Sequence, residues 1–69
     1  AGYHKTDWKD NLIYICWPSG HEQFFWYTED NLLQRQSNNE GYNAHYWYNK
    51  DKLIRVEHVD KDDIWYEYY

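Results

Sequence analysis

Two histidines and a glutamate in the C-terminal half carry side chains that could do chemistry. His45, His58 and Glu67 are of the types that ligate transition metals and that exchange protons in small ribonuclease-like hydrolases. Their spacing matches no established motif. We therefore interpret them as surface histidines beside a glutamate and keep a small His/Glu hydrolase as an alternative. No metal ion or cofactor is predicted.

Aromatic rings are the second feature that could bind another molecule. The chain has nine Tyr, five Trp and two Phe in 69 residues, and a domain of this size has little interior in which to enclose them. Tyr and Trp give large contact areas at low side-chain entropy cost and are enriched at protein interfaces. The predicted contact residues are Trp47, Trp65, Tyr66, Tyr68 and Tyr69. Because flat rings also stack on sugars, carbohydrate binding is an alternative.

Carboxylates gather beside these rings, at Glu57, Asp60, Asp62, Asp63 and Glu67. Asp62 and Asp63 are predicted to form the rim of a binding surface that faces a partner of basic character. The simpler interpretation is a solvated loop whose charges keep a neighbouring edge strand from aggregating. The loop lacks the glycine and the distal glutamate of an EF-hand, so calcium is not predicted.

Net charge, apolar runs, cysteine count and length limit the classes of function. A net charge of -5 argues against nucleic acid as a partner, because Lys and Arg supply most phosphate affinity, and against an anionic membrane surface. No apolar run approaches the roughly 20 residues of a membrane span. Cys16 stands alone, so no disulfide forms within the chain. The length predicts a single domain, residues 1–69.

The N-terminal half is expected to contain a hairpin and a short helix. Residues 1–10 are polar and are interpreted as an irregular arm. Residues 11–17 and 21–27 are rich in β-branched and aromatic side chains and flank Pro-Ser-Gly, which predicts two strands joined by a turn, with Trp17 near His21. Thr28 followed by two acidic residues and two leucines is typical of a capped helix over residues 29–37.

The C-terminal half is expected to form a three-stranded antiparallel meander. Residues 42–48, 53–59 and 64–69 alternate with period two and are separated by short polar loops. The predicted fold class is α+β, a small antiparallel sheet in the order β-β-α-β-β-β. The alternative is an all-β small barrel of the SH3 or OB type. The sequence is interpreted as having no internal repeat.

Pairing these strands predicts how their side chains divide between two faces. With Tyr48 opposite Leu53 and Val59 opposite Ile64, His45 falls opposite Val56 and His58 opposite Trp65. One face then carries Asn43, His45, Trp47, Ile54, Val56, His58, Trp65, Glu67 and Tyr69, and the other carries Ala44, Tyr46, Tyr48, Leu53, Arg55, Glu57, Val59, Ile64, Tyr66 and Tyr68. Both faces offer rings, so one face is expected to pack on the helix and the first hairpin. The other would leave aromatic surface for a partner.

The favoured function is a non-enzymatic protein-binding or inhibitory module that acts through an aromatic, acid-edged sheet face. Homo-oligomerisation through the same face is a variant of this hypothesis, since it would compensate for a small core. Carbohydrate binding and the His/Glu hydrolase remain alternatives. An engineered binding scaffold would show the same bias toward Tyr, Trp, Asp and Asn.

Overall fold

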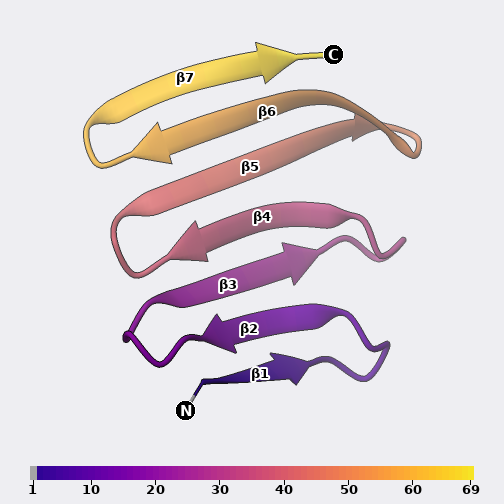
Figure 1. Cartoon of the computed structure of the whole chain (residues 1–69). Helices are drawn as coiled ribbons and strands as arrows, with labels where there is room; N and C mark the ends of the chain where they lie inside the picture. Colours follow the sequence, from indigo (N-terminus) through magenta and orange to yellow (C-terminus); the bar gives the residue numbers. More distant parts are fainter. Residues whose placement is uncertain (1) are drawn as a thin grey trace.

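A computed structural model describes residues 2–69, which form one open, seven-stranded antiparallel sheet (Figure 1). The strands follow one another across the sheet in chain order, so every connection is a hairpin. Their bounds are β1 Tyr3–Thr6, β2 Leu12–Cys16, β3 Glu22–Tyr27, β4 Leu33–Asn38, β5 Tyr42–Asn49, β6 Lys52–Asp60 and β7 Asp63–Tyr68. The extents of 38 × 33 × 13 Å are those of a single layer, and neither face of the sheet is covered by another element.

The predicted helix over residues 29–37 is wrong, and so is the α+β class. Thr28 does cap a structure, but the structure is a turn: its Oγ1 accepts hydrogen bonds of 3.2 Å from the backbone N–H of Asp30 and of Leu32. Asn31 then takes a positive φ of 66°, and strand β4 begins at Leu33. A helix this short would need another element to dock against. As a strand, the segment instead pairs with β3 on one side and β5 on the other.

The remaining strand predictions divide into confirmed and corrected ones. The hairpin of β2 and β3 is confirmed, with the Trp17 and His21 rings 4.9 Å apart, and so is the meander of β5, β6 and β7. The irregular arm is wrong for Tyr3–Thr6, which forms β1, whereas residues 7–10 belong to the turn that follows; Ala1 lies outside the described residues. The all-β class of the alternative is right, but the sheet stays open between β1 and β7, so it is not a barrel.

Three of the six turns share a side-chain closure that was not predicted from the sequence. Asp7, Thr28 and Asn38 each accept two backbone N–H bonds on a side-chain oxygen. A residue with positive φ lies in every turn: Asp10, Gly20, Asn31, Gly41, Lys50 and Lys61. Such residues match the twist of a tight hairpin loop to that of its strands.

These turns belong to an internal repeat of 21 residues, contrary to our prediction that none exists. Residues Gly20, Trp26, Tyr27 and Asp30 recur 21 positions later as Gly41, Trp47, Tyr48 and Asp51. After the turn, Leu33 and Leu53 are equivalent, because they pair with Tyr27 and Tyr48. The structure repeats with them. The Tyr27 hydroxyl donates to the Leu12 carbonyl at 2.7 Å, and the Tyr48 hydroxyl donates to the Leu33 carbonyl at 2.6 Å. Each repeat is therefore a two-strand unit tied to the preceding one by a tyrosine.

The register between β5 and β6 decides which side chains share a face. Tyr48 pairs with Leu53 and Val59 with Ile64, as predicted. A bulge between Trp47 and Tyr48, however, shifts the remaining pairs, so that His45 lies opposite Glu57 rather than Val56. Because a one-residue shift exchanges the two sides of a strand, β5 presents to β6 and β7 the face opposite to the predicted one.

Two faces follow from this register and from alternation along each strand. We call one the arginine face; it carries Lys5, Tyr14, Glu22, Phe24, Trp26, Arg35, His45, Trp47, Arg55, Glu57, Ile64, Tyr66 and Tyr68. We call the other the histidine face; it carries Gln36, Tyr42, Ala44, Tyr46, Val56, His58, Trp65 and Glu67.

The small core of the domain lies on the histidine face. Ala44 and Val56, at 0% and 2% exposure, are the buried hydrophobic residues of the described chain. Neighbouring rings on this face have their polar tips bonded: Gln36 Nε2 donates to the Tyr46 hydroxyl at 2.7 Å, and the Tyr42 hydroxyl lies 2.6 Å from His58 Nδ1. The expectation that one face packs on a helix and a hairpin is thus wrong. The sheet builds its core on one face from that face's own side chains.

Candidate functional site

The centre of the arginine face is a ladder of rings and a guanidinium drawn from three adjacent strands. The Cζ atom of Arg55 on β6 lies 4.2 Å from the ring centroid of Trp47 on β5 and 5.1 Å from that of Tyr66 on β7. Trp47 in turn stacks on His45, with centroids 6.2 Å apart, and Tyr66 stacks on Tyr68 at 6.4 Å. A cation over an aromatic face is attracted by the quadrupole of the ring, so Arg55 holds the rings on both sides in place.

A second arginine repeats this arrangement two strands away. Arg35 Cζ lies 4.4 Å from the ring centroid of Trp26, and its Nη2 donates to Asn43 Oδ1 at 3.0 Å. The Trp–Arg pairs on β3–β4 and on β5–β6 are thus equivalent parts of the 21-residue repeat. The repeat is hard to recognise in the sequence at these positions, because the β5–β6 turn is one residue shorter than the β3–β4 turn. Arg55 therefore follows Arg35 by twenty positions.

Neither guanidinium forms an ion pair within the described part of the chain, although the chain has 12 acidic residues. The Nε atoms of both arginines are buried and have no hydrogen-bond partner. A buried donor without a partner costs free energy, so these two groups are unusual in a protein with so many carboxylates available.

Glu57 is the carboxylate that lies beside this ladder, and it binds Tyr66 instead of Arg55. The Tyr66 hydroxyl donates to Glu57 Oε2 at 3.0 Å. This hydrogen bond and the negative charge of Glu57 raise the pKa of the Tyr66 phenol above its ordinary value, while the nearby Arg55 charge partly opposes the shift. Glu57 thereby keeps Tyr66 neutral and oriented.

Most carboxylates lie instead at the two rims of the sheet, where the turns are. Figure 1 shows the turns alternating between opposite sides of the sheet. One rim carries Asp7, Asp10, Glu29, Asp30 and Asp51, and the other carries Glu40, Asp60, Asp62 and Asp63. The three remaining acidic residues, Glu22, Glu57 and Glu67, lie on strand faces. Lys9, Lys50 and Lys52 on the first rim and Lys61 on the second offset part of this charge, so each rim carries a net negative charge. Arg35 and Arg55 lie between the rims, with Glu57 beside Arg55.

The predicted contact residues divide between the faces. Trp47, Tyr66 and Tyr68 lie together on the arginine face and are 39%, 45% and 72% exposed. Trp65 lies on the histidine face, stacked on His58 with centroids 5.1 Å apart and planes at 9°. Tyr69 donates from its hydroxyl to Glu67 Oε2 at 3.3 Å and so joins the same side. The rim candidates Asp62 and Asp63 lie in and next to the β6–β7 turn.

The predicted group of His45, His58 and Glu67 does not assemble. His58 Nε2 lies 2.6 Å from Glu67 Oε1, but the bulge in β5 places His45 on the arginine face, where it stacks on Trp47. Tyr42 occupies the third position instead, bonded to the other ring nitrogen of His58. Among residues 2–69, no three His, Cys, Asp or Glu side chains are placed to hold a metal ion. The same stretch contains no apolar helix long enough to cross a bilayer.

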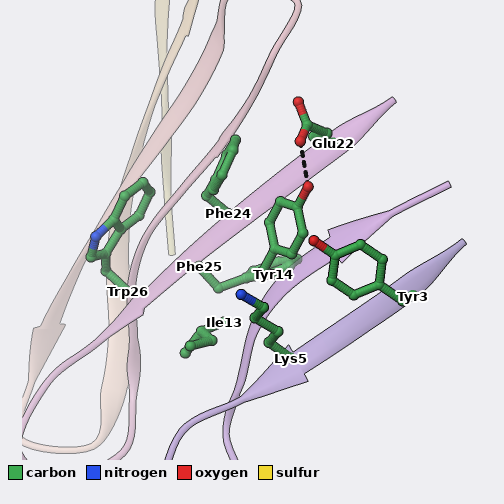
Figure 2. Close-up of a pocket in the computed structure, with 8 residues that line it drawn as sticks. All are labelled: Tyr3, Lys5, Ile13, Tyr14, Glu22, Phe24, Phe25 and Trp26. Atoms are coloured by element: carbon green, nitrogen blue, oxygen red, sulfur yellow. Dashed lines mark hydrogen bonds between the residues drawn. The ribbon is translucent and has the colours of Figure 1, made fainter. Parts of the chain in front are cut away.

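The N-terminal end of the arginine face is hollowed. The hollow has a volume of about 540 Å³ and is lined by side chains that include Tyr3, Lys5, Tyr14, Glu22 and Phe24 (Figure 2). The Tyr14 hydroxyl donates to Glu22 Oε2. That hydrogen bond, together with burial, strongly raises the pKa of the Tyr14 phenol. Neighbouring rings here are tilted, by 59° between Tyr3 and Tyr14 and by 41° between Tyr14 and Phe24, so they form no flat platform.

Three of the contact residues predicted from the sequence, Trp47, Tyr66 and Tyr68, lie on the arginine face, but the prediction did not include Arg35 or Arg55. The available signal was the repeated Trp-Tyr pair at 26–27 and 47–48, each followed by an arginine on the next strand. Each Trp–Arg contact joins residues on two neighbouring strands, so no linear motif in the sequence describes it.

No known family model, curated protein or solved structure matches this chain.

Proposed function

We propose that this protein is a non-enzymatic protein-binding module whose contact surface is the arginine face. The observation that carries the proposal is the ladder of Trp47, Arg55 and Tyr66. It combines half-exposed rings with a guanidinium that no carboxylate of residues 2–69 neutralises. Trp, Tyr and Arg are the residues most enriched at the energetic centres of protein interfaces.

The difference between the two faces supports this choice. On the histidine face, the hydroxyls of Tyr42 and Tyr46 beside the buried Ala44 and Val56 bond to neighbouring side chains, so these two rings serve the fold, while Trp65 and Tyr69 are 43% and 70% exposed. On the arginine face, Trp26, Trp47, Ile64, Tyr66 and Tyr68 are all between 39% and 72% exposed. A sheet 38 by 33 Å is wide enough for an interface of ordinary size, about 800 Å² per partner.

Preorganisation is the second support. Trp47 and Tyr66 are held by Arg55, and Tyr66 is held again by Glu57. Side chains that are already ordered lose little entropy on binding, whereas each mobile one costs about 0.5–1.5 kcal/mol. A rigid aromatic surface of this kind favours association.

The test compares two tryptophans of similar exposure on opposite faces. The full chain, Trp47→Ala and Trp65→Ala would each be immobilised and used to capture proteins from cell extract; each captured protein would then be purified and its affinity measured. Trp47 is 39% and Trp65 43% exposed, so the two variants remove indole rings of similar solvent exposure. We expect a partner that binds wild type and Trp65→Ala alike and binds Trp47→Ala roughly tenfold or more weakly.

Both variants must retain the sheet, which circular dichroism and denaturant unfolding would establish. The proposal would be abandoned if every purified partner bound Trp47→Ala as tightly as wild type. Loss of binding in Trp65→Ala alone would move the contact surface to the histidine face.

A further inference from the structure

We infer that the partner segment bound on the arginine face is a peptide with carboxylates at its centre and basic residues at its margins. This inference rests on the proposed function and specifies the chemistry of the partner. It follows from three features of the face: two fixed guanidiniums, their lack of neutralising carboxylates, and the acidic rims on either side.

The two guanidiniums are fixed by packing rather than by charge. Arg35 lies on the Trp26 ring, and Arg55 lies against both Trp47 and Tyr66. A guanidinium that stacks through its flat face keeps its N–H donors directed along its edge, which suits bidentate bonding to a carboxylate. The rings thus take the position that a carboxylate from this chain could otherwise occupy. Because both Nε atoms are buried and Arg35 Nη2 donates to Asn43, a ligand carboxylate would bind the remaining Nη donors.

The spacing between the arginines sets the spacing of the ligand's carboxylates. Arg35 pairs with His45, and Arg55 pairs with Trp47 two residues further along the same strand, β5. Strands lie about 4.8 Å apart and residues rise about 3.3 Å, so the two arginine Cα atoms are roughly 12 Å apart. An extended peptide places residues i and i+4 roughly 13 Å apart and on the same side. Two acidic side chains at that interval match the pair.

The rims determine what must flank those carboxylates. Asp30 and Asp51 lie on one rim, and Asp60, Asp62 and Asp63 on the other, while Glu57 lies within the face next to Arg55. A ligand that was negative along its whole length would be repelled at both rims. A peptide can carry Glu at its centre and Lys at its ends, whereas a nucleic-acid strand carries a phosphate at every residue. The charge pattern therefore favours a peptide.

Two synthetic peptides of identical composition test this inference. The matched peptide is Lys-Lys-Glu-Thr-Val-Thr-Glu-Lys-Lys, and the inverted control is Glu-Lys-Lys-Thr-Val-Thr-Lys-Lys-Glu. Both would be titrated into the full ¹⁵N-labelled chain while the backbone amides and the Nε–Hε signals of the arginines are followed by NMR. A single-stranded oligouridylate would be titrated in parallel.

We expect the matched peptide to shift the Nε–Hε signals of Arg35 and Arg55 and to bind roughly tenfold or more tightly than the inverted one. Arg55→Lys and Arg35→Lys keep the charge but lose the stacked fork, and each should weaken the matched peptide severalfold. The peptide inversion needs no mutation, so the comparison holds even if one variant unfolds.

Three results would overturn the inference: equal binding of the two peptides, arginine signals that do not move, or tighter binding of the oligouridylate. If both peptides bound equally and only amides of the arginine face shifted, the inferred order of Glu and Lys along the ligand would be wrong. The proposed binding face would still hold. Shifts confined to the histidine face, together with partner capture that survives Trp47→Ala, would contradict both.

Discussion

The hydroxyl of Tyr42 and Nδ1 of His58 lie 2.6 Å apart on the histidine face. The other ring nitrogen of His58 lies 2.6 Å from Glu67 Oε1, so a phenol, an imidazole and a carboxylate form one hydrogen-bonded chain across β5, β6 and β7. Trp65 stacks on the imidazole and fixes its plane. This chain joins the edge strand β7 to the interior of the sheet through side chains as well as backbone.

The first prediction concerns the tautomer of His58. A phenol donates to Nδ1 and a carboxylate accepts from Nε2–H, so neutral His58 should hold its proton on Nε2. The nitrogen chemical shifts of the imidazole at a pH where it is neutral would measure this. His45, which stacks on Trp47, is the comparison within the same spectrum. A proton found mainly on Nδ1 of His58 would contradict the hydrogen-bond chain.

The second prediction locates the core. Val56→Ala should lower the free energy of unfolding by about 2 kcal/mol, because it removes two buried methyl groups and leaves a small cavity. Val56 is 2% exposed, whereas Ile64 on the same sheet is 59% exposed. Ile64→Ala should therefore cost well under 1 kcal/mol. Denaturant unfolding of both variants measures the difference, and equal losses would place the core elsewhere.

The third prediction uses one substitution at two neighbouring lysines. Lys50 has a φ of 60°, a conformation that costs a non-glycine residue about 1–2 kcal/mol. Lys50→Gly should therefore stabilise the protein by about 0.5–1 kcal/mol, after allowing for the greater freedom of glycine when unfolded. Lys52 begins β6, so Lys52→Gly should destabilise by a similar amount. Unfolding curves that shift in the same direction for both variants would refute the turn geometry.

The fourth prediction concerns alkaline pH. Burial is the main cause that raises the pKa of the phenols of Tyr27, Tyr42 and Tyr48 above the ordinary value of 10.0. On raising the pH, these tyrosines ionise first in the unfolded chain, so the free energy of unfolding is unaffected below about pH 10 and falls above it. Phenolate absorbance should rise at higher pH in the folded protein than in urea. Superimposed titration curves would contradict the shift.

Much of the strand structure could be predicted from the sequence. The alternating segments that became β2, β3, β5, β6 and β7 were recognisable because period-two patterns and turn residues are local signals. β4 was not, because its turn uses the same Thr28 cap that a helix would use, and the two structures differ only in the pairing partners available. The internal repeat was hidden by a turn that is one residue shorter in its second copy.

The candidate site was predictable in its residue types but not in its assembly. Trp47, Tyr66 and Tyr68 were identified from their chemistry, but a bulge beside Trp47 decided that they share a face with Arg55 and that His45 is separated from His58. Bulges shift register by one residue and leave little trace in a single sequence.

The sequence by itself determined that the chain is acidic, exceptionally aromatic and built largely of short strands joined by polar turns, since these properties depend on composition and local pattern. Only the tertiary structure decided that the sheet remains a single layer, that the histidine face holds the buried Ala44 and Val56, and that Trp47, Tyr66 and Tyr68 share the other face with Arg55. The physical reason is register: hydrogen bonding between strands fixes which side chains meet, and one extra residue in a strand reverses the face that follows.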